Sequence, residues 1–160
     1  MMKKRSEPKP LESEAEIKSA LMGYLARREY TRQELTDRLS ARCDAAMLAS
    51  VLDQFEEAGY QSDQRFAGVL LRSKSQQGYG LRRVQMDAKR KGLDNALMQE
   101  AEESEEIDWF ELAKSVYQRK FSQPLEKGDY KGYQKRQRFM VNRGFSFDQI
   151  RYAMESSPEE

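Results

Sequence analysis

Apolar residues recur three and four positions apart along almost the whole chain, and strict alternation of apolar and polar residues does not occur. A spacing of three and four is typical of an α-helix with one buried face, whereas alternation is typical of a β-strand. Proline, which interrupts helices, is missing from Ala15 to Gln123. The pattern therefore predicts an all-α protein.

Three helices with short connections are predicted in the first part of the chain. The first covers about Ser13–Glu29, and Thr31 is expected to cap the second, with Glu34 in the capping-box position. The third begins at Asp44 and ends at Gly59, because glycine readily takes the left-handed conformation that ends helices. The side chains expected to face inward are Ile17, Leu21, Tyr24, Leu25, Leu35, Leu39, Leu48, Val51, Leu52 and Phe55.

The middle of the chain has the same predicted plan. Asp63 is expected to cap one helix, and the turn Gly78-Tyr79-Gly80 leads into a second. Gly92 ends that second helix before a third begins. The side chains expected to face inward here are Phe66, Val69, Leu70, Leu81, Val84, Ala88, Leu97 and Ala101.

The last part of the chain is predicted to start a helix near Ile107. A longer turn runs from Pro124 to Gly128, and a basic helix follows that ends at Arg143-Gly144-Phe145. Ser146 is expected to cap the final helix. The side chains expected to face inward are Phe110, Ala113, Val116, Tyr117, Phe147, Ile150 and Met154.

Some residues recur at corresponding points of these units. Tyr79 follows Tyr30 by 49 residues, Gly92 follows Cys43 by 49, and Tyr130 follows Tyr79 by 51. A repeated offset of this kind indicates tandem repeats. We therefore expect three tandem three-helix repeats that form an elongated, curved helical protein. The expected parts are a flexible tail at 1–12, repeats at 13–60, 61–104 and 105–156, and a C-terminal tail at 157–160.

Charge is segregated along the chain, although the formal net charge is only +1. Residues 65–91 contain eight Lys or Arg and one acid, for a net charge of +7, and residues 112–143 contain nine Lys or Arg and two acids, again +7. Between them, residues 92–111 contain eight acids and no basic residue, for −8. Because a solvated helix face usually mixes both signs, the basic blocks favour a surface for phosphates or for an acidic protein. A merely solubilising face is the less favoured alternative.

The basic helix Gly80–Lys91 illustrates the pattern, because its cations fall opposite the apolar residues that face the core. Cations of the preceding helix extend this surface, and the later basic helix repeats the chemistry, including at Lys131 and Arg136. Tyr79 is interpreted as a plug between helices, with an aromatic that stacks on a base as the less favoured alternative. The candidate binding residues are Arg65, Arg72, Lys74, Arg82, Arg83, Lys89, Arg90, Lys91, Lys135, Arg138 and Arg143.

Several kinds of chemistry are excluded by composition. Histidine is absent and Cys43 is the single cysteine, so neither an intramolecular disulfide nor a Cys/His zinc cluster can form. Cys43 also lacks the imidazole partner that activates a cysteine nucleophile. The acids between Asp94 and Glu111 lack a spacing that would converge metal ligands, and no phosphate-binding glycine loop follows Gly78. We therefore expect no enzyme activity and no cofactor.

The sequence also gives an expectation for location. The basic N-terminus Met1–Arg5 is followed by polar residues and prolines, so no signal peptide is expected. No segment is long and apolar enough to span a membrane, and cysteine is nearly absent, as in proteins of reducing compartments. We expect a cytoplasmic monomer with no membrane partner.

Five short segments carry a more specific signal. They are Thr31–Leu35, Asp63–Ala67, Gln77–Gly80, Arg90–Leu93 and Arg138–Phe147. In this order and spacing they resemble the RecX family of bacterial regulatory proteins, and the likeness extends over about residues 15–155. Two positions depart from the family pattern: Gln77 stands where a lysine is usual, and Leu81 where a proline is frequent.

The resemblance implies tandem three-helix repeats and a role in DNA recombination and repair, within the SOS response. It implies a modulator that binds the RecA recombinase, lies in the groove of the RecA–DNA filament and usually inhibits strand exchange and ATP hydrolysis. The implied partner is the RecA filament on single-stranded DNA, with DNA phosphates as a further candidate contact. Two alternatives stay open: a DNA-binding helical module that acts alone, and a helical adaptor whose partner is unrelated to DNA.

Overall fold

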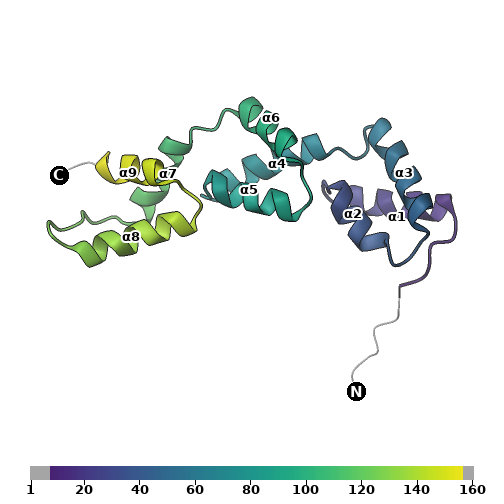
Figure 1. Ribbon diagram of the computed structural model, residues 1–160, viewed down its shortest axis with the longest axis horizontal. Coiled ribbons are helices and arrows are strands. Elements are labelled where there is room, and N and C mark those ends of the chain that lie inside the picture. Colours follow the sequence, from purple (N-terminus) through teal and green to yellow (C-terminus); the bar gives the residue numbers. More distant parts are fainter. Residues whose placement is uncertain (1–7, 157–160) are drawn as a thin grey trace, which may run out of the picture. The chain divides into compact units, whose positions relative to one another are not determined.

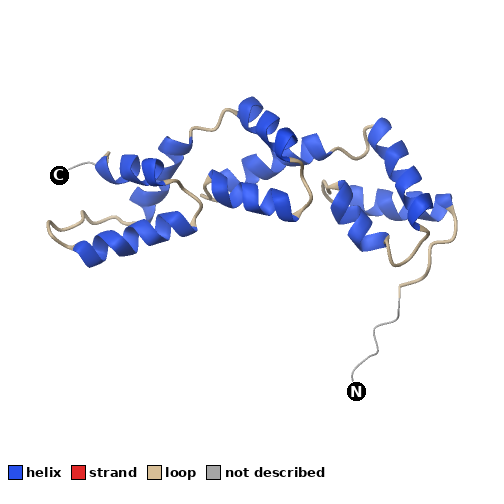
Figure 2. Cartoon of the chain, viewed as in Figure 1, coloured by secondary structure: helices blue, strands red, loops and turns tan. Residues whose placement is uncertain are grey.

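The computed structural model describes residues 8–156, which form nine α-helices and no β-strand (Figures 1 and 2). The predicted all-α class is therefore confirmed. Residues 1–7 of the expected N-terminal tail and the C-terminal tail at 157–160 lie outside the described residues. The helices are α1 (Glu14–Leu25), α2 (Arg32–Leu39), α3 (Ala45–Glu57), α4 (Asp63–Gln76), α5 (Leu81–Arg90), α6 (Asn95–Glu105), α7 (Trp109–Lys120), α8 (Tyr130–Asn142) and α9 (Phe147–Glu155).

The chain divides into two compact units, of which the first ends at Phe66 and the second begins at Ala67. The first unit contains α1, α2, α3 and the start of α4. Thr31 and Glu34 form the predicted capping box, with both hydrogen bonds at 3.0 Å. Asp44 caps α3 by accepting a hydrogen bond from the Met47 amide at 2.9 Å. The core of this unit comprises Ile17, Leu21, Tyr30, Leu35, Leu39, Leu48, Val51, Leu52 and Phe55.

The first helix is shorter than predicted, because α1 ends at Leu25 and not near Glu29. Beyond this end the chain turns, and the guanidinium of Arg28 lies 3.6 Å from the centre of the Tyr30 ring. The same guanidinium pairs with the Glu34 carboxylate at 3.1 Å. The residues that periodicity assigns to the last helical turn therefore form a bend, which a cation–π contact and an ion pair stabilise.

The predicted cap of α4 is wrong. Asp63 is the first residue of α4, and the side chain of Ser62 accepts the hydrogen bond from the Arg65 amide at 3.1 Å. Asp63 Oδ1 instead accepts from the Arg32 amide at 2.9 Å and from Gln61 Nε2 at 2.8 Å. The carboxylate therefore joins the start of α4 to the start of α2 inside the first unit.

The second unit contains the rest of α4 and helices α5 to α9. Within it α7 packs along α9 (Figure 1), and Ser146 and Gln149 form a capping box that confirms the predicted cap of α9. The buried apolar residues around α4, α5 and α6 are Ala67, Leu70, Leu71, Val84, Ala88, Leu93, Met98 and Ala101. Those around α7, α8 and α9 are Ala113, Val116, Tyr117, Met140, Phe145, Ile150 and Ala153.

Three side chains predicted to face inward are exposed: Val69 at 38%, Phe110 at 43% and Phe147 at 56%. The buried stripe of α4 includes Leu70, its neighbour in the chain, which turns Val69 outward. Phe110 instead packs edge-on against Tyr152 at the surface, with ring centroids 5.6 Å apart. Phe147 is the first residue of α9, before the helix has reached the core.

The turn before α5 is joined to the end of α8 by backbone hydrogen bonds. The amide of Gly80 donates to the Arg143 carbonyl at 2.8 Å, and the amide of Arg82 donates to the Gly144 carbonyl at 3.1 Å. These bonds bring the N-terminus of one basic helix to the C-terminus of the other. Among the described residues, no helix is long and apolar enough to cross a membrane.

Candidate partner-binding surface

Helix α5 presents cations on its outer face. Val84 and Ala88 are buried, and Arg82, Lys89 and Arg90 are exposed. Positions separated by seven and eight residues share one side of a helix, so these three cations lie on one face. Within residues 8–156 none of the three forms an ion pair. Three cations are thus available to an anionic ligand.

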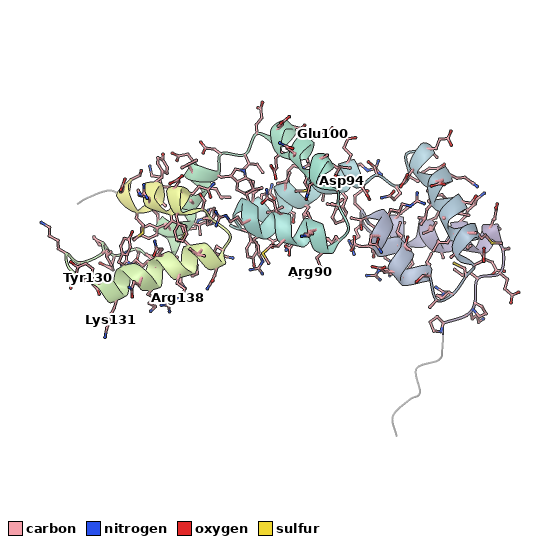
Figure 3. The ribbon with its side chains drawn as sticks, in the orientation of Figure 1. Arg90, Asp94, Glu100, Tyr130, Lys131 and Arg138 are labelled. Atoms are coloured by element: carbon pink, nitrogen blue, oxygen red, sulfur yellow. The ribbon has the colours of Figure 1, made fainter. Side chains whose placement is uncertain are left out.

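Helix α8 has a similar face. Lys131, Lys135 and Arg138 are exposed and are spaced four and three residues apart, which places them on one side of the helix. In Figure 3, Arg90, Arg138 and Lys131 project from the same edge of the second unit, the lower edge in that view, whereas Glu100 of α6 projects from the opposite edge. Arg83 of α5 is also exposed, but its guanidinium lies over the Tyr79 ring. We call the other exposed cations of the two helices the basic edge: Arg82, Lys89, Arg90, Lys131, Lys135 and Arg138.

Three other candidate cations already have partners inside their own unit. Arg65 Nε pairs with Glu29 at 2.6 Å, and its other two nitrogens donate to backbone carbonyls. Arg72 of α4 pairs with Glu105 at the end of α6. Lys74 lies 3.7 Å from the Asp87 carboxylate of α5. Arg65 thus joins α4 to turns of the first unit, and Arg72 and Lys74 join α4 to α6 and α5. The three side chains are therefore less available to a partner than those of the basic edge.

A further group of cations surrounds the half-buried ring of Tyr79. The charged groups of Lys74, Arg83 and Arg143 lie 5.3 Å, 4.9 Å and 4.7 Å from its ring centre. They come from α4, α5 and the end of α8, so the ring sits where these elements meet, as expected for a plug between helices. Lys91, the candidate cation that directly follows α5, is half-buried.

Exposed apolar residues that were not predicted from the sequence lie on the same two helices. Met86 of α5 is 60% exposed, Tyr130 of α8 is 79% exposed and Tyr133 is 41% exposed. In the sequence, each of these residues is an apolar residue on the polar side of a basic helix, and this position could have predicted its exposure. Arg136, in contrast, is half-buried, since its guanidinium donates to the Tyr117 hydroxyl at 2.9 Å and lies 4.9 Å from the Phe121 ring centre.

Acidic residues do not form a metal centre in the part of the chain that the structure describes. No group of three or more Cys, Asp or Glu side chains is arranged there to hold a metal ion. Glu102 and Glu105 of α6 accept hydrogen bonds from Gln85 and Arg72. The surface therefore consists of exposed cations, with exposed methionine and tyrosine side chains beside them.

Known proteins with similar sequences share this architecture. The model of the second three-helix domain of RecX matches residues 62–101, and the model of the third matches residues 106–154. The regulatory protein RecX of Chromohalobacter salexigens is 38% identical over 142 residues, which cover 88% of this chain and 92% of that protein. The regulatory protein RecX of Pectobacterium atrosepticum is 36% identical over 138 residues, which cover 86% of this chain and 84% of that protein.

Solved structures agree at the level of the fold. The crystal structure of RecX from Lactobacillus salivarius matches with a TM-score of 0.76 over 89% of this chain and 94% of that chain, at 17% sequence identity. The two sequence relatives are more than twice as identical to this chain, and each alignment covers most of this chain and most of the relative. The chain therefore belongs to the RecX family of regulatory proteins, which confirms the resemblance drawn from its five segments.

Proposed function

We propose that this protein regulates the RecA recombinase by binding the RecA–DNA filament through its basic edge. In this proposal α5 and α8 lie in the groove of the filament and contact acidic RecA side chains, DNA phosphates or both. Bound protein inhibits strand exchange and ATP hydrolysis. The observation that carries the proposal is the set of exposed, unpaired cations on α5 and α8 in a chain that belongs to the RecX family.

The charge pattern supports an anionic partner. Side chains that stabilise the fold, such as Arg65 and Arg72, are paired with carboxylates, whereas the basic edge has no such partners among the described residues. Like charges on one face repel each other in the free protein, and an anionic ligand relieves that repulsion. If all six cations contacted phosphates of single-stranded DNA, log K would fall with log salt concentration with a slope of about −4.

The test measures ATP hydrolysis by RecA on single-stranded DNA while the protein is added up to stoichiometric amounts. We expect the rate to fall as the protein is added. A variant with Arg82→Glu, Lys89→Glu and Arg90→Glu should inhibit at least about tenfold less well, because each reversal replaces an attraction with a repulsion. Far-UV circular dichroism checks that its helix content is unchanged.

A matched control reverses three exposed cations outside α5 and α8. Arg27→Glu, Lys127→Glu and Arg151→Glu change the net charge by the same amount. This control should inhibit RecA nearly as well as the unmodified protein. If the folded wild-type protein leaves ATP hydrolysis unchanged at stoichiometric amounts, the proposal fails. If both triple variants lose inhibition equally, net charge and not the basic edge is responsible.

A second candidate function is binding to DNA without RecA. It is favoured by Tyr130 and Tyr133, which are exposed beside the cations of α8, because aromatic rings beside cations suit stacked bases and phosphates. A gel shift with single-stranded DNA in the absence of RecA discriminates between the two. Tight binding that depends on sequence would support a module that acts alone, and weak, salt-sensitive binding would support the filament.

The remaining expectations form part of the same proposal. We propose that the basic edge belongs to the second and third of three tandem repeats, with boundaries near residues 61 and 105. RecA acts on chromosomal DNA, so the protein works in the bacterial cytoplasm, and it binds the filament as a monomer. Sedimentation of the free protein tests the monomer, and limited proteolysis tests the boundaries, with cleavage expected first between the repeats.

A further inference from the structure

A groove of about 610 Å³ runs between α5 and α6, inside the second unit. Each helix contributes residues with the spacing of a single helical face, so the groove follows both helices over two turns. The residues from α5 include Arg82, Met86 and Lys89, and those from α6 include Asn95, Met98 and Gln99. Most of the lining therefore comes from two helices, and Leu93 of the turn between them completes it.

The centre of this groove is apolar. Met86 is 60% exposed, although it is flanked on its own helix by cations. Leu93 and Met98 also line the groove and form its floor, because they are buried, with only 6% and 5% of their surface exposed. Methionine adapts its shape to different apolar partners, so the centre suits an inserted aliphatic or aromatic side chain.

The wall formed by α5 is cationic. Arg82 lies four residues before Met86 and Lys89 three residues after it, so one cation stands on each side of the apolar centre. The opposite wall offers the neutral amides Asn95 and Gln99. Glu102 is the one acid among the lining residues, and it already accepts a hydrogen bond from Gln85 Nε2 at 2.9 Å.

We infer that this groove binds an acidic peptide segment of a partner protein, which inserts one apolar side chain against Met86 and places carboxylates on Arg82 and Lys89. The inference rests on the proposed function, since it names the class of ligand that the α5 part of the basic edge takes. A peptide fits better than a nucleic acid because phosphates need only the cations, whereas the exposed methionine and its apolar floor gain from burial only against an apolar side chain.

Fluorescence anisotropy of the full-length protein with synthetic probes tests this inference. The probe is a short fluorescein-labelled peptide in which glutamates flank a central leucine–phenylalanine pair. The comparison peptide carries the same charge but has serines in place of the apolar pair, and a labelled oligothymidine reports on binding to nucleic acid. We expect the apolar probe to bind at least about tenfold more tightly than the serine peptide, since it buries apolar surface.

The variant Met86→Ser removes the apolar centre and keeps every cation. It should lower the affinity for the apolar probe about tenfold and change the affinity for oligothymidine less than about twofold. Arg82→Glu should lower the affinity for both peptides. The matched control is Met22→Ser, which removes another exposed methionine, 47% exposed, from α1 of the first unit and should leave all three affinities unchanged. Both methionines are exposed, so neither substitution should unfold the protein.

Three outcomes would overturn the inference. Equal affinity for the two peptides would show that the groove does not bind an apolar side chain. Weaker oligothymidine binding in Met86→Ser, by the same factor as the apolar probe, would assign the face to nucleic acid. Self-association that Met86→Ser abolishes would assign the groove to a second copy of the chain. Inhibition of RecA ATP hydrolysis, measured on the same wild-type sample, separates these failures from a failure of the proposed function.

Discussion

Gly80 and Gly144 touch at the backbone, since a Cβ atom placed on Gly80 would lie 2.4 Å from the carbonyl carbon of Gly144. The contact joins the start of α5 to the end of α8 through the hydrogen bonds of Gly80 and Arg82 described above. No side chain fits between two backbones at this distance. The relative position of the two basic helices thus depends on the absence of a methyl group.

Gly80→Ala should therefore destabilise the second unit by about 1–3 kcal/mol, because the methyl group forces the two turns apart. Trp109 is the single tryptophan and lies in that unit, so the urea dependence of its fluorescence follows the unfolding. The control is Gly23→Ala in the interior of α1, where a Cβ meets nothing within 4 Å. It should not shift the tryptophan transition, and an equal shift in both variants would contradict the prediction.

Asp63→Ala should destabilise the first unit by about 1–3 kcal/mol, because it leaves the Arg32 amide without its acceptor and removes one of the two acceptors of the buried Gln61 Nε2. Asp63→Asn keeps an oxygen acceptor and should cost less than Asp63→Ala. Urea unfolding followed by far-UV circular dichroism measures both.

A comparison within the same unit separates the hydrogen bonds from charge. Asp53 forms a 2.6 Å ion pair with the side chain of Arg32, but the Asp53 side chain is 70% exposed. Asp53→Ala should therefore cost no more than about 1 kcal/mol. A cost as large as that of Asp63→Ala would mean that the charge of the acid, and not its backbone contact, stabilises α2.

Tyr79→Leu should destabilise the second unit by about 1–2 kcal/mol, because it removes the aromatic face that lies beside Lys74, Arg83 and Arg143. Tyr79→Phe keeps that face and should change the free energy of unfolding by less than about 0.5 kcal/mol. Trp109 fluorescence in urea again provides the measurement. Equal losses in both variants would assign the role of Tyr79 to its hydroxyl group.

Cys43 should be alkylated slowly at neutral pH. Burial raises the pKa of the Cys43 thiol, and the neighbouring Asp44 carboxylate raises it further, so less of the reactive thiolate is present. The rate of reaction with iodoacetamide increases as the thiol loses its proton. The pH midpoint of that increase should therefore be higher in the folded protein than in urea. A midpoint at or below that of the unfolded chain would contradict this prediction.

Local patterns in the sequence predicted local features correctly. The capping box of Thr31 with Glu34 and the cap of α9 by Ser146 were predicted, and both involve residues only three positions apart, so their geometry follows from the chain itself. The all-α class follows in the same way from spacings of three and four. Asp63 shows the limit of such reasoning: the local pattern predicted a cap of α4, but the carboxylate binds the Arg32 amide, 31 residues earlier, and Ser62 accepts the hydrogen bond from the Arg65 amide.

The candidate surface divides along the same line. The sequence by itself determined that α5 and α8 are basic, and that Val84 and Ala88 turn the cations of α5 outward. Only the tertiary structure decided which cations stay free: Arg65 meets Glu29 across 36 positions and Arg72 meets Glu105 across 33. A charge count includes every cation equally, whereas an ion pair requires two side chains to be close in space, and that proximity is set by how distant helices pack.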